Sequence, residues 1–189
     1  MYTHRPRRFS RRSLLNLGAG LAAGGLSLAA ARGALAYPDP TDDGTDTLTV
    51  AVPPGIADGQ HWVDVNLSQQ VAAAMEGGNI VQAILVTTGM PGYDTPTGQF
   101  TIKYRVADEH MTSDALGIPR NSPEGYDLYH VLWTQYFTYY GHALHDNYWR
   151  PLSVFGHEAT SHGCVGMVES DARFLWDWVD VGSLVNIHY

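Results

Sequence analysis

The sequence has a single cysteine, Cys164, among 189 residues. One thiol cannot build an internal disulfide framework, and zinc ribbons that need several cysteines are also excluded. Charged residues are scarce, at 16%, and no acidic residue lies before residue 37. From residue 37 onward, five basic residues are set against nineteen acidic ones, a balance of −14. So acidic a body excludes nucleic acid as an expected partner, because binding phosphates requires clustered Lys and Arg.

The chain does have enough apolar residues for one folded domain. Hydrophobic residues make up 44% of the sequence, which excludes wholesale disorder. The length fits one domain, or one domain plus a targeting segment. Twenty Gly, ten Pro and eleven Tyr favour a β-rich, turn-rich fold over a helix bundle.

Residues 1–36 have the features of a signal peptide. Residues 4–12 are rich in arginine, and residues 13–31 form an uncharged stretch of Leu, Ala and Gly. Residues 34–36, Ala-Leu-Ala, match the small-x-small pattern at which export peptidases cleave. Residues 10–15, Ser-Arg-Arg-Ser-Leu-Leu, match the twin-arginine export pattern. An uncleaved membrane anchor is the alternative, since 19 uncharged residues just suffice to cross a bilayer.

The pattern predicts export by the twin-arginine machinery to the periplasm, cell wall or extracellular space. After cleavage of the signal, no membrane span would be left. Residues 37–47 then form a short acidic linker, and residues 48–189 form the folded domain. Strand patterns occur at residues 63–67, 80–88, 100–106, 129–140 and 184–187. Alternation in the first of these predicts a half-buried strand.

One helix is predicted near the C-terminus. Ser170 is its expected N-cap, Asp171 favours its first turn, and Gly182 ends the segment. Its apolar face consists of Phe174, Leu175, Trp178 and Val179. The domain is therefore expected to be mainly β with one main helix.

Cys164 lies in the segment Ser161-His162-Gly163-Cys164-Val165. Free cysteines usually behave as small buried hydrophobes, and that is the first interpretation. Two neighbours favour a nucleophile instead. Gly163 lets the backbone approach a ligand closely, and His162 shares a face with Cys164 on an extended chain. A nearby imidazole can take the proton of a thiol and make it nucleophilic.

The segment from Ser161 to Val165 resembles the S/T-H-G-C-(V/I) core of the L,D-transpeptidase (YkuD-like) family. The family motif begins with a further His, and fifteen residues separate His145 from Ser161. Residues 62–70, 95–100 and 176–182 resemble the family's opening strand, its T-P-x-G-x-F hairpin and its closing helix. The resemblance covers residues 48–189, which become a catalytic domain. It implies a β-sandwich or closed barrel of mixed sheets that needs no cofactor.

The resemblance implies a cysteine acyltransferase that acts on peptidoglycan stem peptides. Cys164 would attack the third residue of a stem tetrapeptide, release the terminal D-alanine and form a thioester. An amine of a neighbouring stem would resolve the thioester into a 3→3 cross-link. Water as acceptor would make the protein an L,D-carboxypeptidase. Members of the family are also sensitive to carbapenems, which acylate the same cysteine.

The resemblance implies that His145 is the general base and that the backbone carbonyl of Asp146 orients it. His162 could be the base by adjacency, but we expect it to support the site or contact substrate. His142, three residues before His145, is a further alternative. The N–H groups of Gly163 and Cys164 are candidate oxyanion donors.

Ser161 is expected either to hydrogen-bond within the loop or to be solvated. Gly166 departs from the family pattern, in which Arg or Asn helps to hold the loop or the substrate. This departure leaves open a catalytically silent wall-binding module with the same fold. A zinc site is the other rival, with candidate ligands His142, His145, His157, His162 and Cys164. The other histidines of the folded domain are expected to be structural: His61, His110, His130 and His188.

Overall fold

The computed structural model describes residues 35–36 and 47–189. The predicted signal peptide and linker lie almost wholly outside the described residues, so they stay predictions. The elements, in order, are β1 (Leu35–Ala36), β2 (Thr47–Leu48), β3 (His61–Asn66), β4 (Val71–Glu76), β5 (Asn79–Leu85), β6 (Gly98–Thr101), β7 (Tyr104–Thr112), η2 (Ser113–Leu116), β8 (Asp127–Tyr136), β9 (Ala143–Asp146), η3 (Leu152–Val154), β10 (Val165–Met167), α1 (Glu169–Trp178) and β11 (Leu184–His188).

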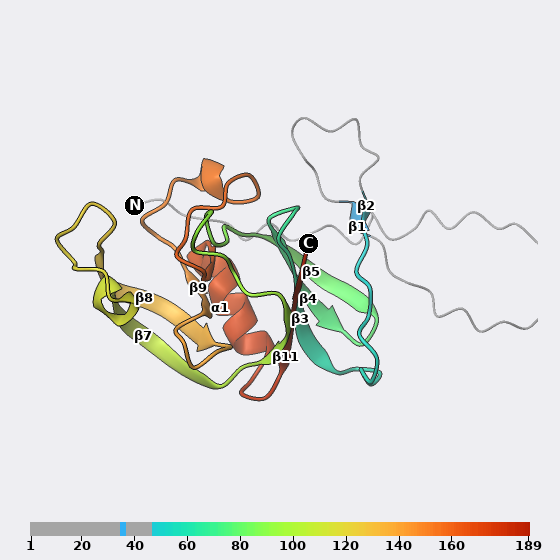
Figure 1. The fold of residues 1–189 in the computed structure, drawn as a ribbon. Coiled ribbons are helices and arrows are strands. Elements are labelled where there is room, and N and C mark those ends of the chain that lie inside the picture. The colour runs from blue at the N-terminus through green and yellow to red at the C-terminus, as the bar shows by residue number, and fades with distance from the viewer. Residues whose placement is uncertain (1–34, 37–46) are drawn as a thin grey trace, which may run out of the picture. The chain divides into compact units, whose positions relative to one another are not determined.

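The strands form two mixed sheets besides the short β1–β2 pair. One sheet has the order β5-β4-β3-β11-β6 and the other β10-β9-β8-β7 (Figure 1). Strands β3 and β11 are parallel, as are β9 and β10. The mainly β fold with one α-helix near the C-terminus is confirmed. The expected closed barrel is wrong, because each sheet within the described part of the chain keeps two edge strands of its own.

Strand β3 is buried on both faces, so the expectation of a half-buried strand is wrong. Val63 and Val65 face the main core, whereas Trp62 packs into a second apolar cluster with Leu48. Asp64, although polar, is only 2% exposed. It accepts one hydrogen bond from Asn186 and is paired with His188, both on the neighbouring strand β11. The polar position at Asp64 thus marks a buried pairing rather than a solvent face.

Two other expected elements differ in detail. Residues 100–106 do not form one strand, because the chain passes from β6 in one sheet to β7 in the other. Ser170 does not cap the helix: α1 begins at Glu169 with Val168 at the N-cap position, and no side chain makes the capping bond. Ser170 is an exposed residue of the first turn.

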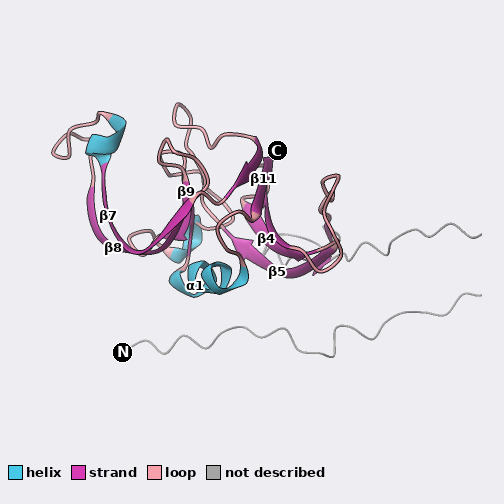
Figure 2. Cartoon of the chain, turned by 90° about the horizontal axis from the view of Figure 1, so that it is seen from below, coloured by secondary structure: helices cyan, strands magenta, loops and turns pink. Residues whose placement is uncertain are grey.

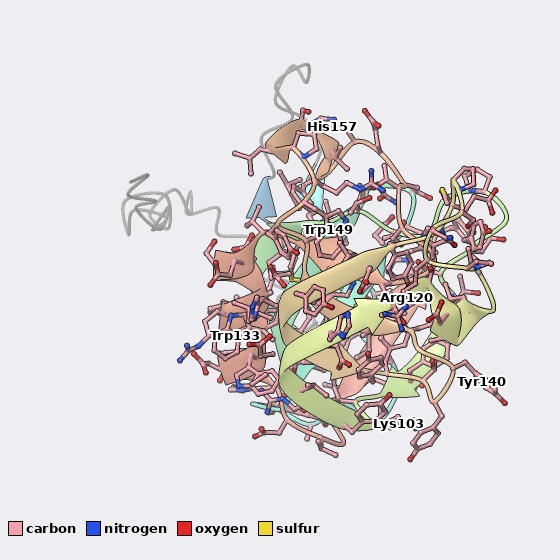
Figure 3. All side chains as sticks on the ribbon, turned by 90° about the vertical axis from the view of Figure 1, so that its left-hand side faces the viewer. Lys103, Arg120, Trp133, Tyr140, Trp149 and His157 are labelled. Carbon is pink, nitrogen blue, oxygen red and sulfur yellow. The ribbon has the colours of Figure 1, made fainter. Side chains whose placement is uncertain are left out.

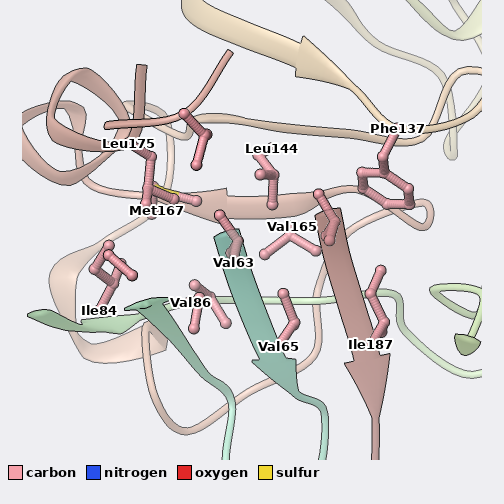
Figure 4. Packing of buried hydrophobic residues seen from close by; sticks show 14 of the residues in the cluster. Val63, Val65, Ile84, Val86, Phe137, Leu144, Val165, Met167, Leu175 and Ile187 are labelled. Carbon is pink, nitrogen blue, oxygen red and sulfur yellow. The ribbon is translucent and has the colours of Figure 1, made fainter. Parts of the chain in front are cut away.

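The main core lies between the two sheets and α1. Figure 4 shows Val63 and Val65 of the five-stranded sheet facing Leu144 and Val165 of the four-stranded sheet. Helix α1 packs on β8 and β9, and its Leu175 is fully buried in the same cluster. Among the described residues, no helix has the length and apolarity required to cross a bilayer.

The β7–β8 hairpin reaches away from the body of the domain and carries η2 near its tip (Figure 2). Its two strands are antiparallel, with a register irregularity between Glu109 and Met111. The tip forms one wall of the candidate site, and the loop before β10 forms the other. The fold thus places a long hairpin opposite the segment that contains Cys164.

Candidate active site

Cys164 ends a loop whose shape is fixed by internal hydrogen bonds. The Ser161 hydroxyl donates to the Cys164 carbonyl at 2.6 Å and accepts from the Gly163 N–H at 3.1 Å. Gly163 has φ +109°, and a Cβ there would lie 2.8 Å from Cδ2 of His142. Glycine is therefore required by both the backbone conformation and the contact. Of the two roles considered for Ser161, local hydrogen bonding is the one observed.

A second segment, residues 88–95 after β5, is hydrogen-bonded to this loop. The Thr95 hydroxyl donates to the Gly163 carbonyl at 3.0 Å and accepts from the Gly89 N–H at 2.9 Å. The Ser161 N–H donates to the Thr88 carbonyl at 3.0 Å. The Thr-Pro-Thr-Gly segment noted in the sequence therefore contributes a hydroxyl that joins the turn to the cysteine loop.

His145 lies on β9, which runs parallel to β10, so that His145 is opposite Gly166. Its Nδ1–H donates to the carbonyl of Asp146 at 2.5 Å. Because a carbonyl only accepts, the proton is on Nδ1 and the Nε2 lone pair is left for a reaction partner. Burial lowers the pKa of His145 to about 4, opposed by this bond to Asp146. The imidazole is therefore neutral at pH 7.

Asp146 holds two neighbours at once. Its carbonyl orients His145, while its buried carboxylate accepts a hydrogen bond from the Leu132 N–H on β8. Burial is the main reason that the pKa of Asp146 is raised to about 6. The expected orienting role therefore has its geometry in place, with the side chain fastened to the adjacent strand.

Cys164 and His145 line one cavity of about 380 Å³. Ser161 and His162 lie on its wall beside Cys164, and Tyr126 of the β7–β8 connection lines it too. Burial raises the pKa of Tyr126 to about 12, and the negative charge of the Cys164 thiolate form adds to this shift. The fold thus brings Cys164 and His145, the nucleophile and base expected from the sequence, into the same cavity.

The thiol of Cys164 is half-buried and donates to the Gly141 carbonyl at 3.4 Å. Burial raises the pKa of Cys164 to about 11, although a backbone hydrogen bond from Ala143 acts in the opposite direction. Since the pKa of His145 is lowered, the resting pair consists of a neutral thiol and a neutral imidazole.

The other histidines occupy different places. His162 packs edge-on against Tyr93, and its buried Nε2 has no partner among the described residues. His142 lies behind Gly163, with Nδ1 at 3.0 Å from the Thr138 hydroxyl, and does not line the cavity. His157 is exposed on the segment after η3 (Figure 3). In the described ranges, no three His, Cys, Asp or Glu side chains are grouped to hold a metal ion.

The four histidines expected to be structural all have structural partners. His110, His130 and His188 pair with carboxylates. His61 stacks on Trp178 with ring centroids 3.7 Å apart. None of the four lines the cavity.

Sequence reasoning missed most of the cavity wall outside the motif, including Tyr126 and Asn147. Asn147 follows His145 by two residues, and this i, i+2 spacing on an extended segment was an available signal. Tyr126 precedes a strand of the hairpin and carried no signal, because only the fold brings the hairpin over Cys164.

Comparisons with known proteins identify the family of the chain. The profile of the YkuD family, described as the L,D-transpeptidase catalytic domain, matches residues 60–187. The chain belongs to the L,D-transpeptidase catalytic domain family. A curated relative, the probable L,D-transpeptidase 3 of Mycobacterium tuberculosis, is 35% identical over 97 residues. That match covers 51% of this chain and 35% of the relative, so the chain spans about a third of the length of that L,D-transpeptidase.

Solved L,D-transpeptidase structures share the fold. An L,D-transpeptidase from Mycobacterium smegmatis superimposes with a TM-score of 0.64 at 25% identity, over 69% of this chain and 59% of that one. L,D-transpeptidase 3 of Mycobacterium tuberculosis, in complex with a faropenem-derived adduct, gives a TM-score of 0.64 at 26% identity. The latter match covers 68% of this chain and 60% of the other.

Proposed function

We propose that the protein is a cysteine-dependent L,D-transpeptidase that cross-links peptidoglycan stem peptides outside the cytoplasm. One observation carries the proposal: Cys164 shares a cavity with a histidine whose Nδ1–H is held by a backbone carbonyl. That bond leaves Nε2 of His145 able to accept a proton, as a general base requires. The family membership supplies the substrate class, the stem tetrapeptide of the cell wall.

In the first half-reaction, Cys164 Sγ attacks the carbonyl carbon of the third stem residue. The thiol proton passes to Nε2 of His145, and the peptide oxygen takes the negative charge. When the tetrahedral intermediate collapses, the bond to D-alanine breaks and its amine receives the proton from His145. A thioester on Cys164 and free D-alanine are the products.

In the second half-reaction, a side-chain amine of a neighbouring stem attacks the thioester. His145 accepts the proton that the amine loses and returns it to the departing Cys164 sulfur. A 3→3 peptide bond and the free thiol result. Water in place of the amine would release a tripeptide, which is the carboxypeptidase outcome of the same chemistry.

We assign the main backbone donor for the oxyanion to the Cys164 N–H. The Gly163 N–H, the other candidate, donates to the Ser161 hydroxyl. Its role is to hold the loop that aims the Cys164 N–H, since such donors act through their prior orientation. His162 lines the cavity, its Nε2 has no partner among the described residues, and we assign it to substrate contact.

The test is the intact mass of the protein after incubation with a carbapenem, together with metal analysis of the same sample. We expect one covalent adduct that is absent in Cys164→Ser. In His145→Ala we expect adduct formation to slow by about 10²–10⁴-fold, the usual contribution of a general base. His142→Ala, the matched control, should retain the wild-type rate because His142 lies outside the cavity.

Incubation with a stem tetrapeptide then tests turnover. A cross-linked dimer with loss of D-alanine supports the transpeptidase, and a tripeptide product supports the carboxypeptidase. Absence of any adduct, with stoichiometric zinc bound, would overturn the proposal in favour of a metal site. Absence of both would identify a catalytically silent wall-binding domain.

A further inference from the structure

We infer that Asn147 supplies, from the neighbouring strand, the side chain that Gly166 lacks, and that its carboxamide positions the donor stem peptide. The inference rests on the proposed function and extends it to the residue that holds the substrate. It starts from the departure noted in the sequence, where the residue after His-Gly-Cys-Val is glycine.

The backbone at Gly166 does not require glycine. Gly166 belongs to β10, its φ lies outside the left-handed region, and it exchanges hydrogen bonds with Thr87 at 2.8 and 2.9 Å. Any residue could adopt such extended backbone. The reason for glycine is the space: a Cβ at residue 166 would lie 2.4 Å from Nδ2 of Asn147.

The side chain of Asn147 lies directly over Gly166. The three atoms nearest to the added Cβ are Nδ2, Cβ and Cγ of Asn147, at 2.4, 3.0 and 3.1 Å. With Asn147 in this conformation there is therefore no room for a side chain at residue 166. Residue 166 follows Cys164 by two positions and is opposite His145, so whichever side chain takes this place stands beside the reacting pair.

The Oδ1 atom of Asn147 makes no hydrogen bond to any residue that the structure describes. The backbone of this residue is anchored, with the N–H donating to the Met167 carbonyl at 2.8 Å and the carbonyl accepting from the Arg150 N–H at 3.2 Å. The side chain is a different case: Asn147 is 2% exposed, and its Oδ1 is buried without a partner in the described part of the chain. Buried amides without partners are uncommon unless a ligand or water satisfies them.

The chemistry of the carboxamide matches a peptide donor. An amide side chain offers both donors and an acceptor, the groups that a peptide backbone presents in return. Asn147 lines the cavity together with Cys164 and His145. A stem peptide seated against Cys164 would thus have its backbone within reach of this carboxamide, and its third carbonyl would be held for attack.

The experiment exchanges the two residues in the full chain. It compares Asn147→Ala, Gly166→Asn and the exchange variant Asn147→Gly with Gly166→Asn. The measurements are kcat and KM for the tetrapeptide, Tm, and the rate of alkylation by iodoacetamide, which reports the thiol without needing peptide binding. Asn186→Ala is the matched control, because Asn186 is a partly buried asparagine outside the cavity.

We expect Asn147→Ala to lower kcat/KM about tenfold, mainly through KM, as the loss of one hydrogen bond to substrate predicts. Its alkylation rate and that of Asn186→Ala should stay at the wild-type value. Gly166→Asn should lower Tm through the clash with Asn147. The exchange variant should recover both Tm and kcat/KM relative to the single Gly166→Asn variant.

Three results would overturn the inference while leaving the proposed function intact. They are an unchanged kcat/KM in Asn147→Ala, a parallel fall in kcat/KM and alkylation rate, or an exchange variant no better than Gly166→Asn. An inactive wild-type protein that forms no adduct is the separate result that removes the proposed function itself.

Discussion

The thiol of Cys164 holds its proton more tightly than a free cysteine does, because burial disfavours the thiolate. The buried imidazole of His145 is likewise neutral, so the two groups do not rest as an ion pair. A pKa of about 11 leaves about one thiol in ten thousand ionised at pH 7. Reaction with a bound substrate then depends on His145 removing the proton during attack, rather than on a thiolate formed beforehand.

The raised pKa of Cys164 predicts how the alkylation rate depends on pH. We expect the rate of iodoacetamide labelling of Cys164 to rise about tenfold per pH unit between pH 7 and pH 10, since only the thiolate reacts. Mass spectrometry of samples quenched at fixed times gives the rate, and Cys164→Ser provides the blank. A plateau at neutral pH would contradict the assignment and would indicate a thiolate–imidazolium pair.

Among the elements, the cysteine loop depends on the turn that follows β5. The Thr95 hydroxyl of that turn donates a hydrogen bond to the Gly163 carbonyl at 3.0 Å. Thr95 is 3% exposed, so water does not replace the hydroxyl readily. The turn therefore fixes the position of the loop at residues 161–164, which orients the Cys164 N–H.

Replacing Thr95 by Val keeps the shape of the side chain and removes the hydroxyl. The Gly89 N–H and Gly163 carbonyl would lose their partner, so we expect a destabilisation of about 1–3 kcal/mol. Carbapenem acylation should slow as well. Urea unfolding and adduct formation measure the two effects, and Thr95→Ser, which keeps the hydroxyl, is the control. Wild-type acylation in Thr95→Val would show that the turn does not position the loop.

Periodicity predicted some elements well and missed others for identifiable reasons. The strand at residues 184–187 and the buried Leu175 of the helix follow from alternation and from a helical apolar face. Strand β4 was not predicted, since its sequence Val-Ala-Ala-Ala-Met-Glu is rich in alanine, which is a poor strand former. It forms because β3 and β5 pair with it on both sides.

The sequence predicted the site residues that belong to the motif, but not those that the fold adds from outside it. Cys164 and His145 share the cavity as expected, because the motif records two strands that lie side by side. The packing of Asn147 over Gly166 is a contact across those strands, and no local pattern encodes it. Ser170 was a wrong prediction of a different kind: its preference for the N-cap position was overridden because α1 begins one residue earlier, at Glu169.

The molecule as a whole buries carboxyl groups whose protonation is linked to folding. Burial raises the pKa of both Asp146 and Asp171 from 3.8 to about 6. An acid with a raised pKa binds its proton more tightly in the folded state, so its contribution to stability is present at low pH. That contribution is lost as pH rises from about 3.8 to about 6. His145 acts oppositely, since its lowered pKa removes stability as pH falls from 6.5 toward about 4.

Asp171→Asn isolates one of these groups outside the cavity. Asp171 accepts from Gln82 at 3.0 Å, and an Asn carbonyl oxygen can accept the same bond. We expect the Tm of the wild type, relative to this variant, to fall as pH rises from 4 to 6.5 and then to level off. Scanning calorimetry across this range measures the difference. If the wild type instead gains on the variant with rising pH, the carboxylate is stabilised by its place in the first helical turn.

Strand β11 lies between β3 and β6, and its Val185 is paired with Val63 across the sheet. The ribosome must therefore translate past residue 188 before the five-stranded sheet can be completed. Until then β3 and β6 present open edges, which are sites for aggregation. An export route that accepts only folded cargo would therefore have to act after translation.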